Sequence, residues 1–188
     1  MYSLTLRIKD IADKLSAALE NTTLRWKTSE NTGDYAEGKP SVYCYTYDDT
    51  DGEMPLNTPS VLVQCTSMDG SGKCQFLIHC CVCNPALQDA ETVADKDGDG
   101  IYSYSKSPRY SSSTVRSDLY RACLMLGEYV FLELQRMSND GEAIENLILN
   151  TPSPYMDMFP YCECTVSCTV SIANEIRAKN DSLLKELL

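Results

Sequence analysis

The stretch that decides the fold class reads YCECTVSCTVSIA, from Tyr161 to Ala173. Polar and apolar side chains alternate strictly along it. Because successive side chains of a β-strand point to opposite faces of a sheet, this alternation predicts a half-buried antiparallel strand with one wet face. The apolar face carries Cys162, Cys164, Val166, Cys168, Val170 and Ile172.

Segments upstream of this stretch also have the composition of strands. Residues 42–47, 60–65 and 73–82 are rich in β-branched, aromatic and cysteine residues. A turn-forming cluster at 67–72 separates the last two, which predicts an antiparallel hairpin. Residues 73–82 are apolar on both faces, a pattern typical of a central strand covered on both sides. The polar residues 28–41 contain glycine and proline, so we expect a loop there.

Helices are predicted by apolar side chains that recur at spacings of three and four. Such stripes mark residues 4–19, 115–137 and 174–188, whereas residues 142–149 fit either a helical turn or a strand. The order of elements predicts a single α+β domain over residues 1–188. We expect an antiparallel sheet, with the N-terminal helix and the long second helix packed on it, plus a C-terminal helix.

Composition and charge exclude several functional classes. The formal net charge is −11, and the 16 Lys and Arg residues form no basic stripe. Direct sequence-specific binding of nucleic acid is therefore not expected, because it needs clustered cations. No apolar run is long enough to cross a membrane, and the N-terminus does not read as a signal peptide. The ten cysteines are accordingly expected to be buried free thiols in an intracellular protein.

The polar segment 84–114 contains a motif that resembles a calcium-binding loop. Asp95, Asp97 and Asp99 alternate and are followed by Gly100, as in the first six positions of such a loop. The twelfth position, where a bidentate glutamate belongs, is Lys106. Its positive charge would repel the ion. An acidic turn is the favoured interpretation, and a calcium-dependent binding module is an alternative.

Cysteine and histidine side chains suggest two other kinds of chemistry. His79 next to Cys80, Cys81 and Cys83, with the cysteines of the final strand, could supply zinc ligands, but the spacing is not that of a zinc knuckle. His79 could also activate a neighbouring thiol in a cysteine hydrolase. Because it lies in the middle of a predicted strand, a structural histidine is favoured. We therefore expect no catalytic residues and no cofactor.

The order of the elements and several short strings resemble the tail terminator, or tail-completion, proteins of long-tailed bacteriophages and prophages. The strings are TPSVLVQ at 58–64, CQFLIHCCVCNP at 74–85 and PSPYMDMFPY at 152–161, behind an N-terminal amphipathic helix. The resemblance covers most of residues 1–173. The chain departs from the pattern in its long 84–114 segment, its many cysteines and its C-terminal helix, which leaves a related neck or head–tail joining protein as an alternative.

The resemblance implies a non-catalytic homo-oligomer, a ring that is expected to be a hexamer. Such a ring sits on the last ring of the tail tube, stops its growth and offers a docking face to the head connector. Its partners would be further copies of itself, the tail-tube protein and the head-connector protein. Its location would be the cytoplasm of the bacterial host during assembly, and then the tail or neck of the virion.

The 84–114 segment is also the expected assembly element. Tyrosine and arginine are enriched where interfaces bind most strongly, because they bury a large area and still satisfy their polar tips. An acidic protein that gathers such residues in one segment is expected to place them against a neighbouring subunit or the tail tube. The candidate interface residues are Tyr102, Tyr104, Lys106, Arg109 and Tyr110.

Overall fold

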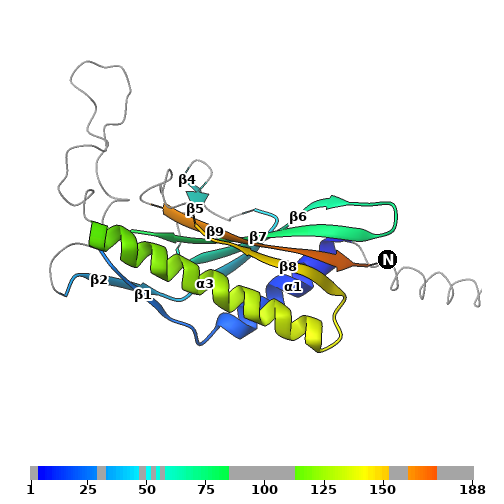
Figure 1. The fold of residues 1–188 in the computed structure, drawn as a ribbon, viewed down its shortest axis with the longest axis horizontal. Coiled ribbons are helices and arrows are strands. Elements are labelled where there is room, and N and C mark those ends of the chain that lie inside the picture. Colours follow the sequence, from blue (N-terminus) through cyan, green and yellow to red (C-terminus); the bar gives the residue numbers. More distant parts are fainter. Residues whose placement is uncertain are drawn as a thin grey trace, which may run out of the picture.

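A computed structural model (Figure 1) describes residues 4–28, 33–46, 50–51, 54–55, 58–84, 113–152 and 161–172. Helix α1, Leu4–Leu19, forms where it was predicted. Its apolar stripe, which includes Ile8, Ile11 and Leu15, is buried in the core. The predicted C-terminal helix at 174–188 lies outside the described residues.

A five-stranded sheet forms the centre of the fold, in the order β3-β6-β7-β9-β8. Its strands are β3 (Ser41–Cys44), β6 (Ser60–Met68), β7 (Lys73–Cys83), β8 (Ile144–Asn150) and β9 (Tyr161–Ser171). The predicted β6–β7 hairpin is confirmed, and β9 pairs antiparallel with both β7 and β8. The sheet is mixed and not purely antiparallel, because β3 runs parallel to β6. The α+β class holds.

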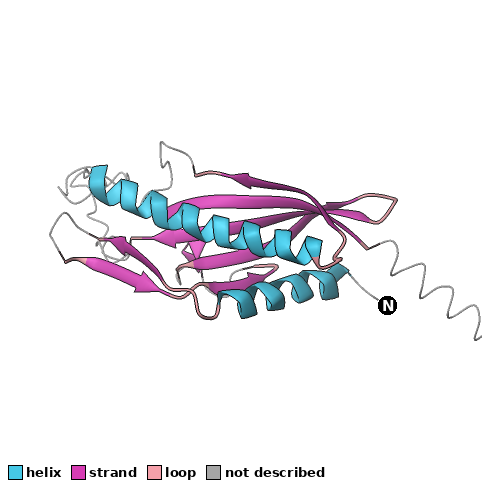
Figure 2. Cartoon of the chain, turned by 60° about the horizontal axis from the view of Figure 1, so that its bottom comes forward, coloured by secondary structure: helices cyan, strands magenta, loops and turns pink. Residues whose placement is uncertain are grey.

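The long helix α3, Ser113–Asn139, and α1 lie on the same side of the sheet (Figures 1 and 2). The core forms between these helices and one face of the sheet. From the sheet it takes the alternate residues of β7 and β9, including Phe76, Ile78 and Val166, and from α3 it takes Leu119 and Leu126. The inward face predicted for the final strand is thus confirmed.

A β-hairpin that was not predicted extends beside the N-terminal part of α3. It consists of β1, Leu24–Lys27, and β2, Tyr35–Gly38, which pair antiparallel. The expectation of a loop throughout 28–41 was therefore wrong at β2. Leu24 and Trp26 are buried in the core, and the Lys27 backbone N–H donates to the Asp118 carboxylate of α3 at 2.6 Å. Tertiary packing and this hydrogen bond, rather than local pattern, hold the hairpin in place.

Two further short strands form, and strands β8 and β6 differ in extent from the segments expected. Strands β4 (Thr50–Asp51) and β5 (Met54–Pro55) form a small antiparallel pair. The ambiguous segment at 142–149 resolves as strand β8. Strand β6 continues to Met68, past the start of the predicted turn, through an irregular register between Cys65 and Ser67. Within the described part of the chain, no helix is long and apolar enough to cross a membrane.

Candidate assembly surfaces

The side of the sheet that faces away from both described helices is only partly buried, and we call its central residues the open face. These residues alternate with the core residues of β7 and β9, and they are Gln75, Leu77, His79, Glu163, Thr165 and Ser167. Strand β7 is central, as expected, but the expectation that it is covered on both sides was wrong along its middle, where Leu77 and His79 remain half-buried. Along β7, the end near Cys81 and Cys83 is buried on this side.

The histidine singled out in the sequence lies on this open face. His79 is in register with Thr165, and its Nδ1 atom lies 2.6 Å from Oε1 of Glu163, two residues along β9. Both side chains are about one-fifth exposed, at 22% and 23%. The pair forms because strands β7 and β9 bring together residues that are 84 positions apart. Sequence periodicity placed His79 on a strand but could not identify its partner.

The neighbouring thiol is poorly suited to nucleophilic attack. Cys81 lies opposite Glu163 in the sheet register and is 1% exposed. Burial, reinforced by the negative charge of Glu163, raises the pKa of Cys81 well above its usual range. Burial likewise raises the pKa of Cys83 to about 12. Because the thiolate is the reactive form, these two cysteines offer no activated nucleophile beside His79.

The rest of the open face is a network of uncharged polar side chains. The Asn150 side-chain amide donates to the Thr165 hydroxyl at 3.2 Å, and the Asn146 amide contacts the Thr169 hydroxyl at 3.3 Å. The Thr169 hydroxyl in turn donates to the Gln75 side-chain oxygen at 3.3 Å. These bonds link β8, β9 and β7 across the face. They satisfy polar groups without adding charge. The same side of the sheet also carries the Lys73–Glu145 ion pair and the apolar side chains of Leu77 and Ile148.

Several cysteines gather inside the core rather than at a metal site. The Cys123 thiol on α3 donates to the carbonyl oxygens of Cys80, at 3.4 Å, and Cys162, at 3.2 Å, while the Cys164 thiol donates to the Cys123 carbonyl at 3.3 Å. His79 is on the opposite face from Cys80, so the zinc set suggested by the sequence is divided between two faces. Among the described residues, no three His, Cys, Asp or Glu side chains are grouped closely enough to hold a metal ion.

All ten cysteines are free thiols, as predicted. Eight of them are buried, and Cys44 and Cys65 are partly exposed. Hydrogen bonds among the thiols and burial raise the pKa of Cys80 and Cys123 well above the usual value. Hydrogen bonds from the Cys123 and Cys80 thiols lower the pKa of Cys164, against the opposing effect of burial. The cluster packs as small side chains inside the core.

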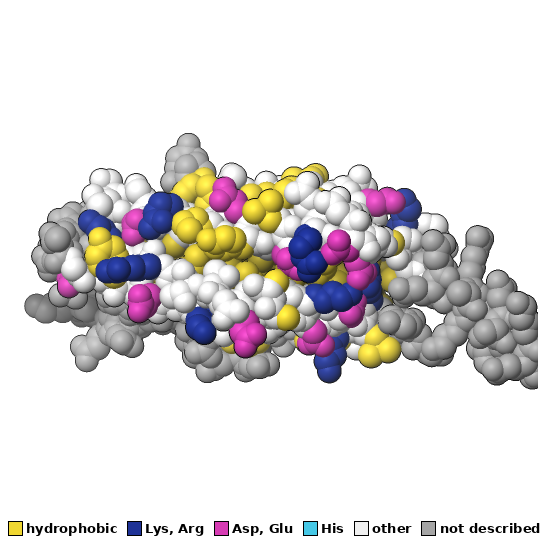
Figure 3. Space-filling model, turned by 90° about the horizontal axis from the view of Figure 1, so that it is seen from below, with side chains coloured by type: hydrophobic (Ala, Val, Ile, Leu, Met, Phe, Trp, Pro, Cys, Tyr) yellow, Lys and Arg dark blue, Asp and Glu magenta, His cyan; other side chains and the backbone are white. Residues whose placement is uncertain are grey.

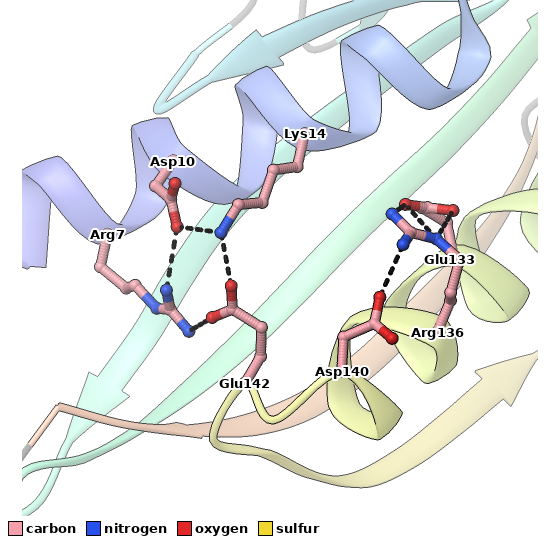
Figure 4. Close-up of polar contacts among 7 residues, drawn as sticks. All are labelled: Arg7, Asp10, Lys14, Glu133, Arg136, Asp140 and Glu142. Atoms are coloured by element: carbon pink, nitrogen blue, oxygen red, sulfur yellow. Dashed lines mark hydrogen bonds and ion pairs between the residues drawn. The ribbon is translucent and has the colours of Figure 1, made fainter.

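An ion cluster joins α1 to the turn between α3 and β8 (Figure 4). Glu142 in that turn contacts both Arg7 and Lys14 of α1, and Asp10 bridges the same two cations at 2.9 Å. Arg7 is 5% exposed, and these two carboxylates compensate its buried positive charge. Hydrogen bonding from Lys14 lowers the pKa of Glu142, against the opposing effect of burial. The cluster fixes the end of α3 to α1 and is a structural device.

The outward side of α3 carries a second candidate surface, which we call the α3 patch. It consists of Met125, Tyr129 and Leu132, at spacings of four and three residues. Tyr129 is 41% exposed and Leu132 is 57% exposed. Figure 3 shows hydrophobic side chains gathered along the middle of the helix-bearing face, with charged side chains toward both ends. The spacing of these three residues is visible in the sequence, but the longer apolar stripe of the same helix was the one assigned to the core.

The candidate sites in the 84–114 segment lie outside the described residues. This holds for the possible calcium ligands Asp95, Asp97 and Asp99. It holds equally for the expected interface residues Tyr102, Tyr104, Lys106, Arg109 and Tyr110. Their roles stay predictions from the sequence.

Comparisons with known proteins identify no relative. No family model matches the chain, and no curated protein and no solved structure matches it significantly.

Proposed function

We propose that this chain is a structural subunit of a phage or prophage tail, a tail terminator that forms a ring on the end of the tail tube. In this role it stops growth of the tube and presents a docking face to the head connector. The observation that carries the proposal is the sheet with helices α1 and α3 on one side and a half-buried, polar open face on the other (Figures 1 and 2). The resemblance in element order and short strings adds to it.

A one-sided sheet suits repeated assembly. A ring arises when one surface of a subunit meets a different surface of the next and the rotation closes. Hydrogen-bonded Asn, Thr and Gln side chains give the open face a hydrophilic surface that needs no charged partner. The net charge of −11 would also repel DNA from a channel wall, which suits passage rather than binding.

The surroundings of the histidine and of its neighbouring cysteine support a structural rather than an enzymatic role. His79 is engaged with Glu163, and the adjacent thiol of Cys81 is buried with a raised pKa. The partners we propose are further copies of the chain, in a ring of about six by the resemblance, with the tail-tube and head-connector proteins. Assembly would take place in the bacterial cytoplasm, and the finished ring would stay in the virion neck.

The experiment uses tail tubes polymerised from a purified phage tail-tube protein of the same phage or prophage. Purified chain is added during polymerisation, and electron microscopy measures tube length and end density. We expect shorter tubes with a ring at one end. A chain that leaves tube length unchanged but binds isolated head connectors would be a neck protein instead. A chain that binds neither would refute the proposal.

Surface variants then test which face assembles. Thr165→Arg and Ser167→Arg add charge to the open face at partly exposed positions, and Gln135→Arg is the matched change on the exposed side of α3. We expect the first two variants to lose ring formation and the third to keep it. Equal capping by all three would show that the open face takes no part.

A further inference from the structure

The five-stranded sheet has two strand edges that no described strand covers, one at each end of its strand order. Strand β8 ends the order and pairs with β9 alone. At the other end, β3 pairs with β6 only from Ser60 to Val63. Residues 64–68 of β6 therefore have β7 on one side and no described strand on the other. Such edges present backbone N–H and C=O groups, which are a template for pairing with another strand.

The side chains along both edges permit close approach of a second copy. Residues 64–68 include no charged side chain and no proline. In β8 the only charge is Glu145, which forms an ion pair with Lys73 at 3.3 Å. Met68 and Ile148 are apolar and 56% and 55% exposed. Two copies of this acidic chain can therefore meet at these edges without bringing uncompensated like charges together.

The two edge strands have matching irregularities. In β6, Thr66 is an extra residue between the partners of Gln75 and Phe76. In β8, residues 146–147 both lie opposite Cys168 of β9, which is itself opposite Phe76. Each edge strand thus gains one residue at the same level of the sheet. A bulge disrupts pairing with a regular strand, whereas two strands with an extra residue at the same level keep one register throughout.

The two edges are also level with each other along the strand direction. Followed through β7 and β9, Gln64 of β6 is level with Ile148 of β8, and Ser67 is level with Glu145. Strands β6, β7, β9 and β8 are antiparallel to their neighbours, so β6 of a second copy in the same orientation would be antiparallel to β8. A rotation about an axis along the strands joins such edges with no shift along that axis, as a closed ring requires.

We propose that β8 of one copy of this chain pairs antiparallel with β6 of the next copy, with residues 145–148 against residues 64–67. In this register Leu147 lies opposite Cys65, and both are already half-buried against the core. Asn146 lies opposite Thr66, and both are polar and exposed. The shared ladder stops at residue 64, where β3 begins to cover β6, so the end of β8 leaves it there.

This inference deepens the proposed ring, on which it rests, by naming the contact that closes it. The test is sedimentation velocity of the purified chain at low ionic strength, without tail tubes. We expect the unmodified chain to associate as its concentration rises. In the proposed register Ser67 of one copy lies opposite Glu145 of the next, and both are exposed.

The sign of a charge at Ser67 should decide how tightly the copies associate. Unlike charges opposite each other on paired strands are favourable, and like charges are unfavourable. Ser67→Lys should therefore strengthen association and Ser67→Glu should weaken it, each by up to about fivefold per contact. Gln135→Lys and Gln135→Glu make the same changes in net charge on the exposed side of α3. These matched controls should show only the smaller effect of net charge.

Reversal of the opposite charge identifies the contact. Glu145→Lys should restore the association of Ser67→Glu, because the two facing charges are again unlike. The substitution removes the Glu145–Lys73 pair, which is exposed and contributes little to stability. Glu128→Lys, at an exposed glutamate of α3, is the control and should restore association only as far as net charge does.

Three outcomes would overturn the proposal. The first is an unmodified chain that stays monomeric at every soluble concentration. The second is Ser67 variants that behave like the Gln135 variants. The third is restoration by Glu145→Lys no greater than by Glu128→Lys. Tail tubes are absent from these measurements, so capping of tubes can succeed when the edges do not pair, and failure of this inference is distinguishable from failure of the proposed function.

Discussion

Gly127 is the position where α3 comes closest to the sheet, and Gly127→Ala tests that packing. A Cβ atom added there would lie 2.5 Å from the Cys164 sulfur and 2.9 Å from Cδ1 of Leu149. Favourable contacts between such atoms are about 3.5–4.0 Å, so the overlap with sulfur is about 1 Å. The half-buried Leu149 can rotate away, whereas Cys164 is buried and its thiol is bonded to the Cys123 carbonyl.

Two effects of opposite sign compete in this substitution. Alanine is favoured over glycine inside a helix by about 1 kcal/mol. Overpacking a core that cannot relax costs about 1–3 kcal/mol. The difference of these two terms leaves a net cost, so we expect Gly127→Ala to lower the free energy of unfolding by up to about 2 kcal/mol. Urea unfolding followed by far-ultraviolet circular dichroism measures the change.

A double-mutant cycle isolates the contact with sulfur. Cys164→Ala removes the clashing atom, so Gly127→Ala in that background should be neutral or stabilising. Gly70→Ala is the control, since a Cβ there meets no atom within 4 Å, and its effect should stay within about 0.5 kcal/mol. An increase in stability of about 1 kcal/mol for Gly127→Ala in the unmodified background would refute the close approach of α3 to β9.

Other consequences of the structure can be measured in the same way. Val166→Asp buries an unpaired charge in the core and should cost more than about 3 kcal/mol, whereas Thr165→Asp on the open face should cost less than about 1 kcal/mol; equal costs in urea unfolding would contradict the assigned faces. The pKa of Glu142 is lowered from 4.5 in the folded state, so its stabilisation is complete at neutral pH and is lost as the pH falls below about 4.5 and through the folded value. Glu142→Gln should lower the free energy of unfolding by about 1–3 kcal/mol at pH 7. It should also reduce the fall of the melting temperature at acidic pH. If the melting temperature of the variant falls as steeply as that of the unmodified chain, the ion cluster is not the source of that fall. In native thiol labelling, Cys44 and Cys65 should react first and the other cysteines only on unfolding, and any cysteine that resists capping after denaturation without reductant would reveal a disulfide.

Strong periodic patterns predicted much of this fold correctly. The alternation at 161–173 identified strand β9 and its core face, and the apolar stripes identified α1 and α3. These predictions succeed because a side chain's direction in a regular element depends only on its place in the repeat. The β1–β2 hairpin escaped prediction because its stability comes from Trp26 in the core and from the contact of Lys27 with α3.

The candidate surfaces were less predictable than the elements. The sequence named His79 but not Glu163, whose carboxylate it meets only because β7 and β9 are neighbours in the sheet. It likewise suggested that His79 and nearby cysteines could bind one zinc ion. His79 and Cys80 are successive residues of β7 and therefore point to opposite faces of the sheet, which separates these possible ligands. Both results depend on strand partners, which local composition does not specify.

The sequence by itself determined the acidic charge, the element types and the inward side of each strongly periodic element. Only the tertiary structure decided that β3 pairs parallel with β6, that α1 and α3 share one side of the sheet, and that Tyr129 and Leu132 of α3 lie outside the core. The physical reason is that periodicity is encoded within a few residues. Pairing and layering instead depend on burial and hydrogen bonds between segments far apart in the chain.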